Sequence, residues 1–325
     1  MKAEKARQII ERFPYSSKKR LGKLLFKENP LLFKDEEHAR MYIRAVTNSI
    51  GKKNRIKQTD KYIGRLPEGE KNDFSPFVLS GKKIGILPDI HIPYHDLEAL
   101  SLAMKHLRGL NVDTIILDGD VIDCHMLSRW EKDPNKRNIA HEIKLFTFFL
   151  DDLRDFFGGI QIVFKLGNHC ERLDRFLIQN APELYDMPVL DYKNLLRMDF
   201  TGDDVQVKDR GIEIVGGKRI IKAGKLNIIH GHEFGPTIFD PVNPARGFFL
   251  RAKSNVIGGH FHRTSEHIES DMDGKVVGAW SIGCLSDLHP DYRPINKWNL
   301  GFAFVAVDGE DFEVHNYKII NGIIR

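Results

Sequence analysis

The chain has 325 residues, of which 42% are hydrophobic and 29% are charged, so it is neither an intrinsically disordered nor a fibrous protein. Its longest apolar runs fall far short of a membrane span, and its first residues lead into an amphipathic stretch instead of the apolar core of a secretory signal. Three widely spaced cysteines, Cys124, Cys170 and Cys284, argue against a disulfide framework, and we expect a reducing, cytoplasmic compartment.

The charge is distributed unevenly along the chain. The formal net charge is +4, yet residues 1–58 contain ten Lys and six Arg against five Glu and one Asp, a net charge of +10. The remaining residues carry 33 basic and 39 acidic side chains, a net charge of −6. An excess of positive charge confined to one end is typical of a segment that binds a polyanion such as nucleic acid.

Residues 1–58 are expected to form a small, all-helical domain. Apolar residues recur at helical spacing from Ala6 to Phe13, from Leu21 to Leu25 and from Ala39 to Val46, and Ser16-Ser17 can cap the second helix. Three short helices with tight turns and a basic surface fit a helix-turn-helix module that binds nucleic acid. They fit equally a helical cap whose Lys and Arg side chains are simply solvated.

A polar and irregular segment, residues 59–80, is expected to link this domain to a body that spans residues 81–325. In the body, short β-rich runs alternate with helical patterns up to about residue 200, and strands joined by hairpin turns follow. Alternation of strands with helices predicts an α/β core.

Each predicted strand in the core of the body ends in side chains that can bind a metal ion. The motifs are Asp89-Ile-His91, Gly119-Asp120-Val-Ile-Asp123, Gly167-Asn168-His169, His230-Gly-His232 and Gly259-His260-Phe-His262. The carboxyl edge of such a sheet is where α/β proteins build their sites, so we expect these side chains to lie close together.

The donor types indicate which metal ions the site suits. Carboxylates, imidazoles and one amide oxygen suit Mn²⁺, Fe²⁺, Zn²⁺ or Ni²⁺, and we expect Mn²⁺ first among them. The potential ligands are too many for one ion: Asp89, His91, Asp120, Asn168, His230, His260 and His262. We therefore expect two adjacent divalent ions, which clamp a phosphoryl group and activate a water for in-line attack.

In their order along the chain, the five motifs resemble those of the calcineurin-like metallophosphoesterase superfamily, over about residues 82–320. The resemblance implies two packed β-sheets flanked by helices, and a hydrolase in which metal-bound hydroxide attacks a phosphate ester. The implied ligands of one ion are Asp89, His91 and His262, and those of the other are Asn168, His230 and His260, with Asp120 bridging the two. The resemblance also implies that His169 stabilises or protonates the leaving oxygen and that Asp123 orients His169.

The residues after His169 depart from the family pattern. Cys170 stands where family members usually carry an acidic residue, and Glu171 follows it. Because this position is not a direct metal ligand, we expect activity to survive, with Asp123 or Glu171 compensating. Arg172 and His232 are candidate contacts to substrate phosphate, although a helix-surface charge and a structural hydrogen bond explain them equally well.

Three functions fit these observations. The first is a phosphodiesterase or nuclease that acts on nucleic acid, favoured by the basic N-terminal domain. The second is a phosphomonoesterase for phosphoproteins or small metabolites, and the third is a non-catalytic binding scaffold of the same fold. Retention of every ligand and of His169 argues against the scaffold. Trp280 and Trp298 fit core or rim positions better than base-stacking platforms.

Overall fold

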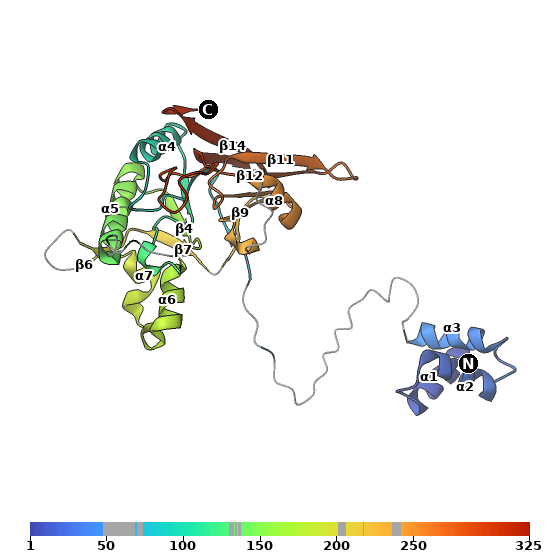
Figure 1. Ribbon diagram of the computed structural model, residues 1–325. Helices are drawn as coiled ribbons and strands as arrows, with labels where there is room; N and C mark the ends of the chain where they lie inside the picture. The colour runs from blue at the N-terminus through green and yellow to red at the C-terminus, as the bar shows by residue number, and fades with distance from the viewer. Residues whose placement is uncertain are drawn as a thin grey trace. The chain divides into compact units, whose positions relative to one another are not determined.

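The computed structural model describes residues 1–47, 69, 74–129, 133, 135, 138–200, 206–216, 218–235 and 242–325. The chain divides into two compact units, Met1–Asn72 and Asp73–Arg325 (Figure 1). Across these described ranges, no helix is long and apolar enough to cross a membrane.

Within residues 1–47, the first unit is helical, as the sequence predicts. Its helices are α1 (Lys2–Arg12), α2 (Lys18–Glu28) and α3 (Glu36–Val46). The side chains of Ser17 and Asp35 accept hydrogen bonds from the backbone N–H groups of Arg20 and His38, and so cap α2 and α3. The apolar faces of the helices share a small core, made of Ala6, Ile9, Leu21, Leu25, Phe33, Ala39 and Ile43.

The second unit is built on two sheets. The larger has the strand order β15-β14-β13-β2-β3-β4-β7. These strands are β2 (Lys83–Pro88), β3 (Thr114–Asp118), β4 (Gln161–Lys165), β7 (Ile212–Val215), β13 (Leu300–Asp308), β14 (Asp311–Ile320) and β15 (Ile323–Ile324). Strands β2, β3, β4 and β7 are parallel to one another, so their carboxyl ends share one edge.

The second sheet has the strand order β1-β8-β9-β10-β12-β11. Its strands are β1 (Phe77–Val78), β8 (Ile221–Ala223), β9 (Leu226–Ile229), β10 (Val256–Gly258), β11 (Ser265–Ser270) and β12 (Val276–Ser281). Strands β9, β10 and β12 run parallel. A short separate ladder joins β5 (Met198–Asp199) to β6 (Gln206–Val207).

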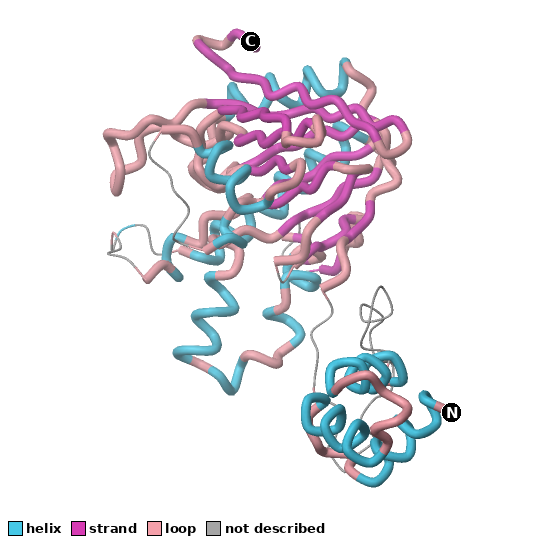
Figure 2. Tube along the Cα trace, turned by 90° about the vertical axis from the view of Figure 1, so that its right-hand side faces the viewer, coloured by secondary structure: helices cyan, strands magenta, loops and turns pink. Residues whose placement is uncertain are grey.

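Alternation of side chains along the central strands explains why the two sheets pack face to face. Ile86 and Ile116 point into one apolar core, which they share with Ile228 and Ile257 of the second sheet. Neighbouring residues such as Leu87 point to the opposite face, into the core beneath the helices, because successive side chains of a strand alternate in direction. The predicted sandwich of two packed sheets is therefore confirmed; Figure 2 shows its strands gathered together in the second unit.

Helices cover the outer faces of the sandwich. Helices α4 (Leu97–Gly109) and α5 (Ile139–Phe157) pack on the larger sheet, and α8 (Pro244–Ala252) packs on the smaller one (Figure 1). Helix α6 (Arg172–Asn180) follows the β4 loop, and α7 (Tyr192–Leu195) comes next.

The C-terminal end of the expected linker is a β-strand in the structure. Residues 59–80 are expected to be irregular, but Phe77–Val78 forms strand β1, which pairs in parallel with β8, and Leu79 is buried. Two residues are too few to show the alternating pattern of a strand in the sequence. The segment is a strand only because it pairs with β8. Residues 48–68 and 70–73 lie outside the described residues.

An ion pair ties α5 to the chain that enters β7. The Arg210 guanidinium donates two hydrogen bonds to the Asp151 carboxylate, at 3.0 and 2.7 Å, and only 2% of the Arg210 side chain is exposed. Burial raises the pKa of Asp151, but the adjacent Arg210 and Lys208 cations outweigh it and hold the pKa below its usual value.

We expect Asp151→Asn to lower the free energy of unfolding by about 3 kcal/mol at neutral pH, because it leaves a buried guanidinium without its anion. Because the pKa of Asp151 is lowered on folding, the ionised carboxylate stabilises the fold at any pH above its pKa in the unfolded chain, about 3.9. This contribution is lost as the pH falls through the pKa of the folded state. Urea unfolding from pH 7 to pH 3 measures the difference in free energy of unfolding between variant and wild type. A difference that grows in acid would contradict this assignment.

Candidate metal centre

All seven predicted metal ligands lie just beyond the carboxyl ends of central strands. Asp89 and His91 follow β2, Asp120 follows β3, and Asn168 follows β4, all in the larger sheet. His230 follows β9, while His260 and His262 follow β10, in the smaller sheet. The site therefore forms where the edges of the two sheets meet.

The backbone at the site is held in an unusual conformation. Five of the predicted ligands have positive φ angles, a conformation that is uncommon outside glycine: Asp89 (48°), His91 (54°), Asp120 (46°), His260 (69°) and His262 (56°). Residues in such conformations cluster at functional sites. Two glycines make room for the ligands, because a β-carbon at Gly119 would collide with the His230 ring and one at Gly167 with the Asp120 carboxylate.

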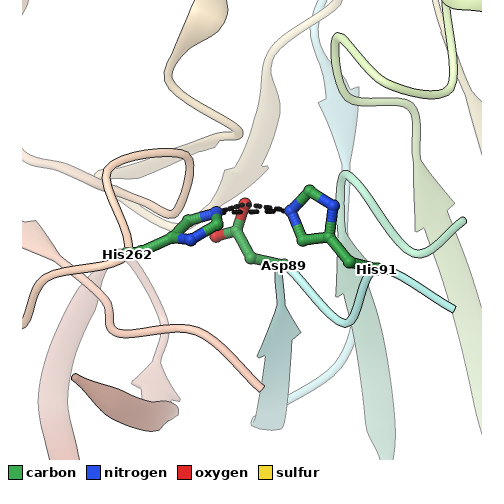
Figure 3. A group of neighbouring side chains, drawn as sticks. All are labelled: Asp89, His91 and His262. Atoms are coloured by element: carbon green, nitrogen blue, oxygen red, sulfur yellow. Dashed lines mark hydrogen bonds and ion pairs between the residues drawn. The ribbon is translucent and has the colours of Figure 1, made fainter. Parts of the chain in front are cut away.

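The first donor group contains Asp89, His91 and His262 (Figure 3). Nε2 of His262 lies 3.3 Å from Oδ1 of Asp89 and 3.3 Å from Nε2 of His91. Nε2 of His91 lies 4.0 Å from the same carboxylate oxygen. All three side chains are buried, so their donor atoms converge on one point that is largely shielded from solvent.

The second donor group contains Asp120, His230 and His260. Nε2 of His230 lies 3.2 Å from Oδ2 of Asp120 and 4.0 Å from Oδ1 of Asp89, so the two groups adjoin. The His230 ring is oriented by its other nitrogen, Nδ1, which donates to the backbone carbonyl of Asp118 at 2.8 Å. Asn168 and His260 line one cavity beside this group.

The electrostatics of the site pair each carboxylate with an imidazole. Burial raises the pKa of Asp89 and of Asp120, but the histidines beside them outweigh it and hold both pKa values below their usual range. Burial lowers the pKa of His230, and the surrounding carboxylates, Asp120 first, outweigh it and raise the pKa to about 10. Burial and the charge of His230 together lower the pKa of His260 to about 3.

The donor atoms of the two groups fit divalent metal ions. Among the described residues, Oδ1 of Asn168 is buried and has no hydrogen-bond partner, although leaving a buried polar atom unpaired is costly. Oδ1 of Asp89 and Nε2 of His230 are buried as well, and their contacts are the ion-pair contacts described above. Two carboxylates, an amide oxygen and imidazoles form the mixed oxygen and nitrogen set that Mn²⁺, Fe²⁺, Zn²⁺ and Ni²⁺ accept.

Asp123 connects the first donor group to His169. One carboxylate oxygen, Oδ1, accepts hydrogen bonds at 2.9 Å from Nδ1 of both His91 and His169. Burial raises the pKa of Asp123, but these two hydrogen bonds and the nearby imidazoles outweigh it and keep the pKa far below its usual value. Asp123 therefore fixes the orientation of both rings, as an outer carboxylate commonly does for metal-binding histidines.

Arg172 covers the other nitrogen of His169. Its Nη2 donates to Nε2 of His169 at 2.9 Å, and its Nη1 donates to the backbone carbonyl of Asp123 at 2.8 Å. Arg172 is thus engaged at the site and is not a free charge on the helix surface.

The departure from the family pattern at Cys170 does not remove the carboxylate that contacts His169. Cys170 is fully buried in the core beneath the helices. Glu171 accepts a hydrogen bond from Nε2 of His232 at 3.2 Å, and no contact with His169 is seen for it among the described residues. Asp123 is thus the carboxylate that contacts His169.

A buried ion pair beneath the second donor group has no counterpart among the predicted residues. The fully buried Lys165 Nζ lies 2.8 Å from Oε1 of Glu233. Glu233 in turn accepts hydrogen bonds from the backbone N–H groups of His230 and Gly231, at 3.0 and 2.6 Å. Burial raises the pKa of Glu233, but Lys165 and nearby histidines lower it to about 2. A lysine at the end of an apolar strand was a sequence signal for a buried cation, but not for its partner.

Comparison with known proteins places these residues in a family. The family model described as calcineurin-like phosphoesterase matches residues 82–264, which include both donor groups. A comparison with curated proteins finds no match.

Solved structures that match the chain include Vps29 from Entamoeba histolytica complexed with Zn²⁺, at 12% identity over 75% of this chain and 96% of that chain, with a TM-score of 0.36. The phosphoesterase YfcE from E. coli is 14% identical over 72% of this chain and 98% of that chain, with a TM-score of 0.35. A dimetal phosphatase from Danio rerio is 12% identical over 72% of this chain and 95% of that chain, with a TM-score of 0.34.

We expect the wild-type protein to bind two Mn²⁺ ions and the Asp120→Ala variant to lose this binding. Asp120 belongs to the second donor group and contacts His230, whose ring also lies near Asp89 of the first donor group. Equilibrium dialysis with metal analysis measures the stoichiometry, and Asp152→Ala, an exposed aspartate on α5, is the matched control. An Asp120→Ala protein that keeps both ions would exclude the predicted bridging role.

Proposed function

Because the chain belongs to the calcineurin-like phosphoesterase family, we propose that it is a dinuclear metal-dependent phosphodiesterase that cleaves nucleic acid. The observation that carries this proposal is the position of two adjoining donor groups beside a histidine that is hydrogen-bonded to a buried carboxylate. Together they supply what hydrolysis of a phosphate ester requires, namely charge neutralisation, an activated water and a proton donor.

Asp89, His91 and His262 would hold one divalent ion, and Asn168, His230 and His260 the other, with Asp120 shared between them. We propose Mn²⁺ as the native metal; Fe²⁺, Zn²⁺ and Ni²⁺ suit the same donors. When bound, the ions lower the pKa of a coordinated water and neutralise charge on the phosphoryl oxygens.

His169 is the proposed proton donor to the leaving oxygen. Its Nδ1 donates to Asp123, so the carboxylate stabilises the ring when a second proton is held at Nε2. Nε2 faces the site, 3.9 Å from Oδ2 of Asp120.

Arg172 is the proposed contact to a phosphate oxygen. In the structure it donates to Nε2 of His169, which prevents that nitrogen from holding a proton. A phosphate oxygen competes for the same guanidinium, because hydrogen bonds between two charged groups are stronger than those to a neutral ring. Binding of substrate would thereby free His169 to act.

The N-terminal unit is the proposed second contact to nucleic acid. Ion pairs with glutamates involve Arg12, Lys23, Arg40 and Arg44, whereas Lys19 and Lys27 are exposed on α2. Exposed lysines bind a phosphate backbone without regard to sequence and with strong salt dependence.

The reaction class is tested by assaying the Mn²⁺-loaded protein on a phosphodiester, a phosphomonoester, and single- and double-stranded DNA and RNA. Hydrolysis of the diester and of nucleic acid is expected. Hydrolysis of monoesters alone would replace the proposal with a phosphomonoesterase for proteins or metabolites. Failure to hydrolyse any ester with any of the four metals would favour a binding scaffold.

We expect His169→Ala to keep both metal ions and to reduce turnover of the diester by about 10²- to 10⁴-fold, the range typical of a lost general acid. Metal analysis of the same sample separates this loss from loss of the ions. Full activity in His169→Ala would rule out its role as proton donor.

We expect removal of residues 1–58 to leave hydrolysis of a small chromogenic diester unchanged and to weaken binding to DNA or RNA, because most of the excess positive charge is lost. Fluorescence anisotropy at several salt concentrations measures the affinity. A full-length Lys19→Glu/Lys27→Glu variant, which retains the helices, should show a smaller loss of the same kind. Unchanged affinity in both proteins would show that this unit does not bind nucleic acid.

A further inference from the structure

Two cavities of contrasting chemistry adjoin the candidate metal centre, one beside each donor group. The first, of about 410 Å³, is lined by His91 and His262 of the first donor group. The second, of about 840 Å³, is lined by Asn168 and His260 beside the second donor group. Their linings share no residue among those that the structure describes, and both volumes lie within the range of about 300–1,000 Å³ that is typical of ligand sites.

The first cavity, which we call the aromatic cavity, suits a flat and uncharged group. Tyr94, Tyr292 and Trp298 line it, together with Asp287 and Asp291. The Trp298 ring centre lies 4.3 Å from that of His262, so the aromatic wall begins directly beside the metal centre. Aspartates repel phosphate, but they accept hydrogen bonds from the N–H groups on the edges of bases.

The second cavity, which we call the basic groove, suits phosphate. Helix α6 lines it with Arg172, Arg175, Phe176 and Gln179, whose i, i+3, i+4 and i+7 spacing places them on one face of the helix. Arg129 and Lys218 line it as well. Glu171 offsets part of this charge through its contacts with His232 and Arg175, at 3.2 and 3.7 Å, and the lining remains cationic.

Phosphomonoesters and phosphodiesters differ in how many organic groups they could place in the two cavities. A phosphomonoester carries a single organic substituent, so it would fill one cavity at most. A phosphodiester carries two, and when its phosphorus lies at the junction of the two donor groups, one substituent can enter each cavity. The junction is narrow, because Oδ1 of Asp89 lies 3.3 Å from a nitrogen of one group and 4.0 Å from a nitrogen of the other.

We propose that this centre cleaves single-stranded nucleic acid, with the base next to the scissile phosphate stacked in the aromatic cavity and the following phosphates lying along the basic groove. The inference rests on the proposed phosphodiesterase function. A single strand is required because a base must leave its stack to enter a cavity, which is least costly where it is unpaired. Stacking on aromatic rings combined with a cationic track is the general way in which proteins bind single strands.

The test uses three substrates with the same type of scissile bond and the full-length, Mn²⁺-loaded protein. They are a dimer of abasic deoxyribose, the dinucleotide TpT and the tetranucleotide dT₄. The ratio of kcat/KM for TpT to that for the abasic dimer reports on the aromatic cavity. The ratio of kcat/KM per scissile bond for dT₄, which has three such bonds, to that for TpT, which has one, reports on the basic groove.

Variants in the two cavities should change different ratios. Tyr292→Ala should lower the TpT-to-abasic ratio about tenfold, with recovery in Tyr292→Phe, because stacking needs the ring and not the hydroxyl. Arg175→Gln/Lys218→Gln should lower the dT₄-to-TpT ratio about fivefold, and added salt should lower it in the wild type. Lys105→Gln, an exposed lysine on α4 that lines neither cavity, should change neither ratio.

The outcomes separate this inference from the proposed function. If bis(p-nitrophenyl) phosphate is not hydrolysed with any of the four metals, the proposed function fails. If it is hydrolysed but both wild-type ratios are close to one, or both sets of variants leave them unchanged, only the inference fails. Faster cleavage of duplex DNA than of dT₄, or of a phosphoserine peptide than of either, would overturn the choice of substrate.

Discussion

Two buried carboxylates, Asp89 and Asp120, lie side by side where the edges of the two sheets meet, and their charge has to be balanced there. The ion-pair partners that the structure shows for them are histidines. A protonated imidazole balances one negative charge, and a divalent ion balances two. The charge of the two carboxylates therefore favours divalent cations over protonated histidines. This requirement explains why polar oxygen and nitrogen atoms are retained in the interior.

The fold meets this requirement by fixing the ligands at strand ends. Parallel pairing aligns the ends of β2, β3 and β4 in one sheet and those of β9 and β10 in the other. Packing of the two sheets through a shared apolar core then holds the ends together. Left-handed backbone at Asp89, Asp120 and His260 turns the chain sharply at each end, and the rigid strands retain this strain.

The sequence pattern alone predicted an α/β core whose strands end in metal-binding side chains, because alternation of strands with helices and motifs at strand ends are local properties. The sandwich of two packed sheets and the grouping of the proposed ligands were implied by the resemblance of the five motifs to the calcineurin-like family. The sequence could not predict contacts between segments that are distant along the chain. The hydrogen bond from Arg172 to His169, the buried pair of Lys165 and Glu233, and the parallel pairing of Phe77–Val78 depend on packing that no spacing encodes. Trp298 was expected at the core or rim, and only the cavity beside His262 suggests a binding role for it.

The central claim is that the two donor groups hold two divalent ions at once. Anomalous diffraction from crystals grown with Mn²⁺ tests this most directly. The account predicts two manganese peaks, one bound by Asp89, His91 and His262, the other by Asn168, His230 and His260, with Asp120 contacting both. A single peak, or peaks bound by other residues, would contradict it.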